Sequence, residues 1–253
     1  MMTILLIRGL SRQQGHWGEF AEVLTRRLKD SGVEANLVFE DLPGFGNRNQ
    51  ESSPSSIEKI AELLFSTLEQ LHNKTGQKIH LLGISMGGMI ALELAKRFPE
   101  LCESLVMINS SVKPVSRIYQ RLRPSAYSAL FKAWFHPVMR ESERQILNIS
   151  SEKYAQDDAL LDKWLRLRKK QPPSRTAAFK QIIAASKFQA PACPPLKKVL
   201  LIASKKDRVA SYKCTENLAK YWSIKSIVHE SAGHDLALDE PEWLANIIVD
   251  WIA

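Results

Sequence analysis

The chain has 253 residues, 45% of them hydrophobic, with a formal net charge of +8 at pH 7. This length and apolar content suffice for a full core, and α/β proteins of this size usually form one domain with an insertion. Its three cysteines, Cys102, Cys193 and Cys214, are widely spaced and follow no metal-ligand pattern. This argues against a disulfide framework or a zinc site, so we expect them to be packing residues.

Targeting and membrane signals are absent from the pattern of apolar residues. No stretch approaches the roughly 18 consecutive apolar residues of a membrane span, and residues 1–7 have neither a basic leader nor a small-residue cleavage site. We therefore expect a cytoplasmic protein with no membrane span. The positive charge comes without a recognisable nucleic-acid-binding module, so nucleic acid is not expected as a partner.

Strand and helix patterns alternate in the first part of the chain. Apolar runs of strand length cover residues 3–7 and 35–39, and apolar residues at spacings of three and four predict helices over residues 19–29 and about 55–72. Ser55 and Glu58 have the spacing of a capping box at the start of the second helix. Two βα units are therefore predicted before residue 76.

Further strand and helix patterns follow after residue 98. Strand patterns cover residues 104–108, 198–203 and 224–229, and helix patterns cover residues 214–222 and 242–251. With one more strand after Lys78, the chain has about six. Continuously apolar strands that alternate with helices predict an α/β fold with a mostly parallel sheet and helices on both of its faces.

A serine lies at a sharp turn in the middle of this pattern. The strand that starts at Lys78 passes through Gly83-Ile84-Ser85-Met86-Gly87 directly into a helical pattern that ends at Phe98. Such a turn strains the backbone of Ser85, and glycines are needed where the strand and the helix crowd it. Since the helix begins directly behind Ser85, the Met86 N–H faces the space where an oxyanion would develop.

The alternation stops between residues 112 and 190. This segment contains helical patterns, among them residues 129–135 and 160–168, but no convincing strand pair. It holds 16 Lys and Arg but only 6 Asp and Glu, a net charge of +10, and the rest of the chain has a net charge of −2. We expect a helical cap at residues 112–190, inserted into a core formed by residues 1–111 and 191–253.

The turn Gly83-Ile84-Ser85-Met86-Gly87 has the pattern Gly-x-Ser-x-Gly, which is called the nucleophile elbow. This elbow and its flanks resemble the α/β-hydrolase superfamily. The resemblance covers both ends of the chain, including the loop that begins Arg8-Gly9-Leu10 and reaches Trp17, and the loop Asp41-Leu42-Pro43-Gly44-Phe45-Gly46. In relatives the residue after the first glycine contributes the second oxyanion N–H, a role that falls to Leu10. Relatives usually have histidine at the position of Arg8. The resemblance makes Arg8, Trp17 and Phe45 candidates for substrate binding.

A serine nucleophile needs a base, and the base needs a carboxylate that fixes its tautomer. The segment that contains His234 follows the last strand and resembles the catalytic-histidine segment of the superfamily. Asp207 follows the strand at 198–203, as in relatives, and the chain order of serine, acid and histidine is kept. The rival acids are Asp235 and Asp239, and the alternative acid position after the preceding strand holds an asparagine. The other five histidines, including His16, are expected to be structural or surface residues.

Serine at the elbow indicates acyl transfer to Ser85 and then to water, on ester, thioester or amide carbonyls. Dehalogenases and epoxide hydrolases of the superfamily carry aspartate there. The resemblance implies a serine carboxylesterase that needs no metal or organic cofactor. A basic cap together with Asp-Leu-Pro-Gly-Phe-Gly is also similar to the pimeloyl-carrier-protein methyl esterases, whose substrate is held by an acidic carrier. The alternatives are a solvated cap without a charged partner, and a ligand-binding receptor with a vestigial triad.

Overall fold

Six parallel strands form one sheet in the computed structural model, which describes residues 1–252. The strand order is β2-β1-β3-β4-β5-β6, which confirms the predicted α/β fold with about six strands. The strands are β1 (Met2–Ile7), β2 (Ala35–Glu40), β3 (Ile79–Ile84), β4 (Cys102–Ile108), β5 (Val199–Ser204) and β6 (Ser226–His229). Because all strands are parallel, their carboxyl ends meet at one edge of the sheet.

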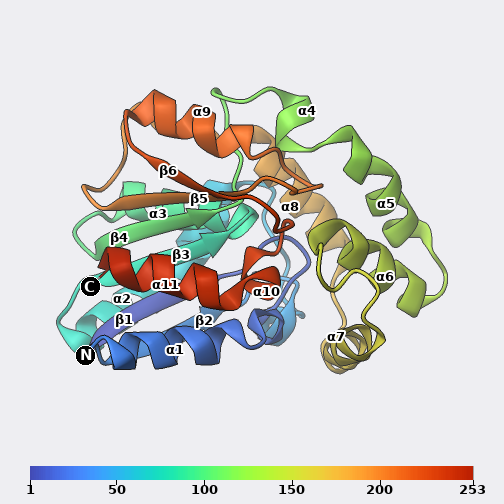
Figure 1. The fold of residues 1–253 in the computed structure, drawn as a ribbon, viewed down its shortest axis with the longest axis horizontal. Helices are drawn as coiled ribbons and strands as arrows, with labels where there is room; N and C mark the ends of the chain where they lie inside the picture. The colour runs from blue at the N-terminus through green and yellow to red at the C-terminus, as the bar shows by residue number, and fades with distance from the viewer. Residues whose placement is uncertain (253) are drawn as a thin grey trace.

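Helices cover both faces of this sheet, as Figure 1 shows. Successive residues of β1 point to opposite faces, so Ile4 and Leu6 belong to one apolar cluster and Leu5 and Ile7 to the other. The first cluster includes residues of α1 (Phe20–Asp30) and α11 (Pro241–Ile252). The second includes residues of α2 (Ile57–Thr75), α3 (Met86–Arg97) and α9 (Lys213–Trp222). Both faces of the sheet are therefore kept from water.

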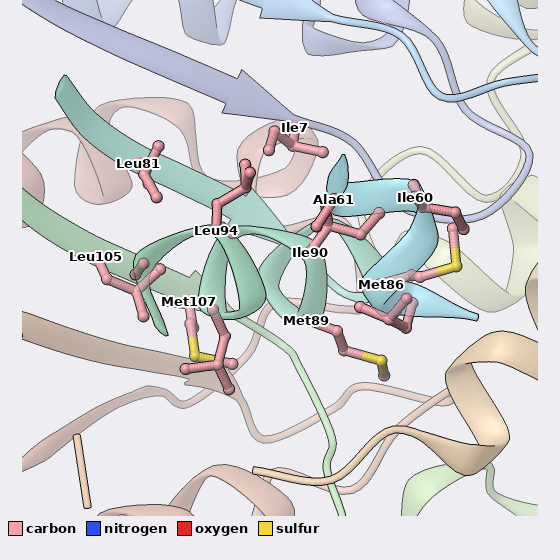
Figure 2. Close-up of a cluster of buried hydrophobic side chains, with 14 of the residues drawn as sticks. Ile7, Ile60, Ala61, Leu81, Met86, Met89, Ile90, Leu94, Leu105 and Met107 are labelled. Atoms are coloured by element: carbon pink, nitrogen blue, oxygen red, sulfur yellow. The ribbon is translucent and has the colours of Figure 1, made fainter. Parts of the chain in front are cut away.

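The helix behind the elbow, α3, is buried along most of its length. Figure 2 shows Ile90 and Leu94 of α3 among side chains of the sheet, with Ala61 of α2 nearby. Ile90, Leu94 and Ala61 have no exposed surface. A buried Leu or Ile side chain contributes about 1.5–3 kcal/mol relative to an exposed one. This packing fixes the first turn of α3, and hence the backbone beside Ser85, on a rigid support.

The predicted capping box at the start of α2 is wrong by one residue. The N-cap is Ser56 and not Ser55, because the helix begins at Ile57. The Ser56 hydroxyl accepts a hydrogen bond from the Lys59 N–H at 3.4 Å and donates one to Glu58 at 2.5 Å. Ser55 has the capping-box spacing to Glu58, but Ser56 is the serine at the N-cap, with φ −145° and ψ 134°.

Five helices follow β4 and precede β5 in the chain. They lie at the carboxyl edge of the sheet (Figure 1). They are α4 (Ile118–Arg121), α5 (Pro124–Phe135), α6 (Met139–Ser150), α7 (Asp158–Lys170) and α8 (Arg175–Lys187). The Ser174 N–H donates to the Gly44 carbonyl at 2.9 Å, and the Arg123 N–H donates to the Val209 carbonyl at 2.8 Å. We call α4–α8 the inserted helices; they are attached to loops that leave the strand ends.

Two further sequence expectations concern surfaces. Within residues 1–252, no helix combines the length and the apolar character needed to cross a bilayer. Cys102 and Cys214 are buried, as expected of packing residues, but Cys193 is exposed. Cys193 lies in the Pro-rich connection before β5, which sequence periodicity does not describe.

Candidate active site

Ser85 lies between β3 and α3 with φ 57° and ψ −121°, a backbone conformation that residues other than glycine rarely adopt. Its N–H donates to the Ile108 carbonyl at 2.7 Å, which fixes the turn to β4. A Cβ on Gly87 would lie 2.1 Å from the Ile7 carbonyl oxygen, and one on Gly83 would lie 2.4 Å from the Gly87 backbone. The elbow thus requires both glycines, for the reason that the sequence predicted.

The loop after β1 runs against the nucleophile. A Cβ on Gly9 would lie 3.0 Å from the Cβ of Ser85 and 3.5 Å from its Oγ. Leu10 follows Gly9 directly, and Met86 is the first residue of α3, where backbone N–H groups have no partner within the helix. The two N–H groups predicted to form the oxyanion hole therefore belong to the two segments that adjoin Ser85.

His234 and Asp207 come together at the same edge. The Nδ1 of His234 is 2.7 Å from Oδ2 of Asp207. The other carboxylate oxygen of Asp207 accepts hydrogen bonds from the N–H groups of Val209 at 2.7 Å and Ala210 at 2.9 Å. Asp207 is buried, so both oxygens are held in place by hydrogen bonds. Of the candidate acids, Asp207 is the one that contacts the histidine ring.

The charge of Asp207 sets the basicity of His234. Burial lowers the pKa of His234, but the Asp207 carboxylate, through its charge and its hydrogen bond, outweighs burial, and Asp235 adds to this effect. The pKa of His234 is therefore raised above its ordinary value of 6.5. Since a hydrogen bond to Asp207 holds the proton on Nδ1, Nε2 is the nitrogen free to accept a proton.

Two residues after β4 tie the nucleophile loop to the histidine loop. Ser110 Oγ donates to the Ser85 carbonyl at 2.7 Å, and Asn109 Nδ2 donates to the His234 carbonyl at 2.8 Å. The Asn109 side-chain oxygen also accepts from the Ser204 N–H at 2.7 Å. Among the described residues, Ser85 Oγ makes no hydrogen bond to His234, so the nucleophile–base contact stays a prediction; in unliganded enzymes this bond is often long.

Arg8 and Trp17, predicted to bind substrate, are both buried. The Arg8 guanidinium forms two parallel hydrogen bonds to Asp235, at 3.0 and 2.5 Å, and lies 4.9 Å from the Trp17 ring centroid. Asp235 is thus engaged with Arg8, away from the histidine ring. Because Arg8 precedes Gly9 and Asp235 follows His234, this ion pair joins the oxyanion loop to the histidine loop.

The fold and this arrangement can be compared with known proteins. The profile of the alpha/beta hydrolase family matches residues 4–247. The chain belongs to this family. A solved structure of a thermophilic esterase from Thermogutta terrifontis has the same fold, with a TM-score of 0.72 at 20% identity over 100% of this chain and 89% of that one.

Two curated proteins are similar over parts of this alpha/beta hydrolase. The biotin biosynthesis bifunctional protein BioHC of Teredinibacter turnerae is 31% identical over 147 residues, 58% of this chain and 23% of that protein. The pimeloyl-[acyl-carrier protein] methyl ester esterase of Aeromonas salmonicida is 34% identical over 109 residues, 43% of this chain and 37% of that protein. The alignments thus span less than two fifths of the length of either relative.

In this alpha/beta hydrolase the inserted helices contact the histidine loop directly. Asp239 accepts hydrogen bonds from the N–H groups of Glu152 at 2.9 Å and Gly233 at 2.7 Å, and from the Ser151 hydroxyl at 2.5 Å. Gly233 precedes His234, whereas Ser151 and Glu152 follow α6. Asp239, a rival acid in the sequence, therefore joins the segment after α6 to the loop that carries His234.

A cavity lies between the loop after β1, the loop after β2 and the inserted helices. Its walls include Leu10, Arg12, His16, Phe45, Trp134 and Arg168. Phe45 lines this cavity, whereas Arg8 and Trp17 are not among its walls, and the substrate-binding role of Phe45 stays a prediction. Sequence patterns assigned no role to Arg12 and predicted a structural or surface role for His16, because no local pattern separates them from other polar loop residues.

No group of three or more His, Cys, Asp and Glu side chains is placed to hold a metal ion within the described part of the chain. The ionisable groups at the sheet edge instead pair with one another, His234 with Asp207 and Arg8 with Asp235. What the arrangement offers is a nucleophile candidate on a strained turn, a base with a raised pKa and backbone N–H groups nearby.

Proposed function

We propose that this chain is a serine hydrolase that cleaves a carboxylic ester or thioester through an acyl-enzyme on Ser85. The observation that carries the proposal is the 2.7 Å contact between His234 Nδ1 and Asp207, at the sheet edge where Ser85 occupies its strained turn. Family membership supports it, because the nucleophile, acid and base follow the chain order of the family. In class terms the activity is that of a carboxylesterase.

The mechanism follows from the roles of these groups. His234 Nε2 takes the proton of Ser85 Oγ as the oxygen attacks the acyl carbon, and Asp207 stabilises the imidazolium that forms. The N–H groups of Leu10 and Met86 hold the oxyanion. His234 then gives its proton to the departing alcohol or thiol, and a water molecule, deprotonated by His234, releases the acid and restores Ser85.

We further propose that residues 112–190 serve as a cap over a core of residues 1–111 and 191–253. Leu130, Ala133 and Trp134 of α5 and Ala178 of α8 give one part of the cavity an apolar wall. An apolar wall suits an acyl chain, since burial of each methylene contributes about 0.8 kcal/mol. The inserted helices would then select the acyl group, while the sheet edge carries out the chemistry.

A second candidate is hydrolysis of an acyl ester held by an acidic carrier protein. The net charge of +10 on residues 112–190 favours it, as does the similarity to the esterase from Aeromonas salmonicida, whose name specifies a carrier-bound ester. A basic surface would steer an anionic carrier toward the cavity. The chemistry at Ser85 would be the same for a free and a carrier-bound substrate.

The test is turnover of short p-nitrophenyl esters by the wild-type chain and by Ser85→Ala, combined with labelling by a fluorophosphonate and mass spectrometry of the labelled peptide. We expect turnover that disappears in the variant, and a label on Ser85. Stoichiometric acylation without turnover would instead indicate a ligand-binding receptor with a vestigial triad. Turnover that persists in Ser85→Ala would contradict the proposal.

A further inference from the structure

Three charged side chains meet inside the cavity, away from the triad. Arg12 Nη1 donates to Oε1 of Glu143, and Arg168 Nη1 donates to Oε2 of the same carboxylate at 2.9 Å. The Arg12 guanidinium also lies 4.1 Å from the Trp164 ring centroid. Arg12, Glu143 and Arg168 all belong to the walls of the cavity. The pairing of Arg12 with Glu143 joins the loop after β1 to α6.

Arg12 has hydrogen-bonding capacity that the protein leaves unused. Its exposure is 8%, and among residues 1–252 its Nη2 has no hydrogen-bond partner. A guanidinium has five N–H donors, and buried donors are nearly always paired because an unpaired one loses its hydration without compensation. Nη1, by contrast, is engaged by Glu143 and lies 3.3 Å from His16 Nε2. Arg12 is therefore a wall residue of the cavity that keeps one buried donor without a partner.

The charges around Arg12 leave an excess of positive charge. Burial raises the pKa of Glu143, but Arg12 and Arg168 outweigh it and lower that pKa, so Glu143 is ionised. Burial, together with the charges of Arg12 and Arg8, holds the pKa of His16 well below its usual value, so His16 is neutral. Arg175 is also a wall residue. The walls of the cavity thus include three arginines, two of which share the Glu143 carboxylate.

We propose that Arg12 and Arg168 form a subsite for a carboxylate of the substrate, so that the enzyme prefers an ester with a second, unesterified carboxyl group. This inference rests on the proposed function and specifies its substrate class. A planar carboxylate matches the fork of a guanidinium, and it would be the acceptor that Nη2 of Arg12 lacks. Leu10, a wall residue of the cavity, directly follows Gly9, which packs against Ser85.

The kinetic test compares esters of equal length. Monomethyl adipate carries a free carboxylate, whereas methyl hexanoate and dimethyl adipate are neutral, and hydrolysis of each is followed by proton release. We expect kcat/KM to be higher for monomethyl adipate, and Arg168→Gln to reduce that preference roughly tenfold or more, as loss of a charged hydrogen bond implies. Arg168→Gln leaves the Arg12–Glu143 pair intact, so folding is preserved.

A variant with the opposite sign separates recognition from loss of structure. Glu143→Gln keeps the shape of the side chain but removes the carboxylate that competes for both guanidinium groups, so it should increase the preference for monomethyl adipate several-fold. Arg140→Gln, on the same helix, is the control: Arg140 pairs with Asp158 and Asp162 on the surface and is no wall residue of this cavity. It should leave the preference unchanged.

Binding is measured separately from activity. Adipate is titrated calorimetrically into the Ser85→Ala variant, and into the same variant with Arg168→Gln, in which Kd should rise roughly tenfold or more. Adipate binding without hydrolysis of any ester would overturn the proposed function but support the subsite. Hydrolysis that depends on Ser85 but shows equal kcat/KM for the anionic and neutral esters, or a preference unchanged in both Arg168→Gln and Glu143→Gln, would overturn the subsite alone.

Discussion

The sheet edge and the inserted helices differ in how tightly they are packed and in the charge that they carry. At the edge, Ser85 and Asp207 follow the buried strands β3 and β5, and His234 follows the half-buried edge strand β6, so the sheet positions all three backbones. The inserted helices carry most of the excess charge and expose aromatic side chains, with Phe131 and Phe135 each 65% exposed. The proposed chemistry thus lies at the edge of the packed sheet, whereas the proposed selection of substrate lies with the inserted helices.

The largest expected effect lies at the sheet edge. Ser85→Ala and His234→Ala should each lower kcat by on the order of 10⁴ or more, and the double variant should be little worse, because residues that act as one unit are not additive. Steady-state kinetics with a p-nitrophenyl ester measure this, and circular dichroism checks that the variants are folded. An active His234→Ala variant would remove His234 from the assignment.

The pairing of Asp207 with His234 has a signature in pH. Asp207→Asn should lower kcat by on the order of 10³ to 10⁴. His234 acts as a base only when neutral, so activity falls as the pH drops through its pKa, which Asp207 raises. Without that charge the acidic limb of the kcat/KM profile should move to lower pH. A limb that stays in place or moves to higher pH would contradict the assigned pair.

The ion pair between the oxyanion loop and the histidine loop should be costly to break from one side. Arg8 and Asp235 have 4% and 3% of their side chains exposed. Arg8→Gln should lower the free energy of unfolding by about 3–5 kcal/mol, because it leaves a buried carboxylate uncompensated. Urea denaturation measures the change.

A double variant, Arg8→Gln with Asp235→Asn, gives the matching control, since removal of both charges should cost less than removal of one. Arg140→Gln, at a surface ion pair, should change the unfolding free energy little. Equal losses for the single and double Arg8 variants would contradict the claim that the uncompensated Asp235 carboxylate causes the loss.

The smallest expected effect comes from the charge of the inserted helices. Replacement of Arg166, Lys169 and Lys170 by Gln should lower kcat/KM for an anionic ester a few-fold and leave a neutral ester unchanged, because surface charge acts mainly on association. The difference should fade as salt rises, since the Debye length is roughly 8 Å at 0.15 M. Equal losses for both esters would leave solubility as the role of this charge.

Local sequence patterns predicted the parts of the molecule that depend on local structure. The strands and the Gly83–Gly87 elbow follow from apolar periodicity and from the steric needs of one turn. Asp207 and His234 were predicted from their positions after strands together with the resemblance to the superfamily. The sequence also predicted that Arg8 lies beside the site, but it did not predict the direction of its side chain. That direction depends on Asp235, 227 residues away.

The cavity cluster could not be predicted for the same physical reason. Arg12 and Glu143 are 131 positions apart, and each alone is an ordinary charged residue in a polar segment. Asn109 shows the converse. The sequence excluded it as an acid because it carries no charge. In the structure its neutral amide donates a hydrogen bond to the loop that carries His234 and accepts one from β5. Which loops pack together is decided by the tertiary fold.

The attachment of the inserted helices has a consequence for how a substrate enters. Asp239, Arg123 and Ser174 fasten this segment to three separate loops of the sheet edge, so it cannot swing away as a unit without exposing several paired groups at once. The turn between α5 and α6, next to Phe135, is held by fewer such bonds. We expect opening there by local breathing, visible as faster amide hydrogen exchange at residues 131–138 than at the three attachments. The rates of substrate entry and product exit would then depend on local opening of the turn between α5 and α6, while the inserted helices as a whole stay attached.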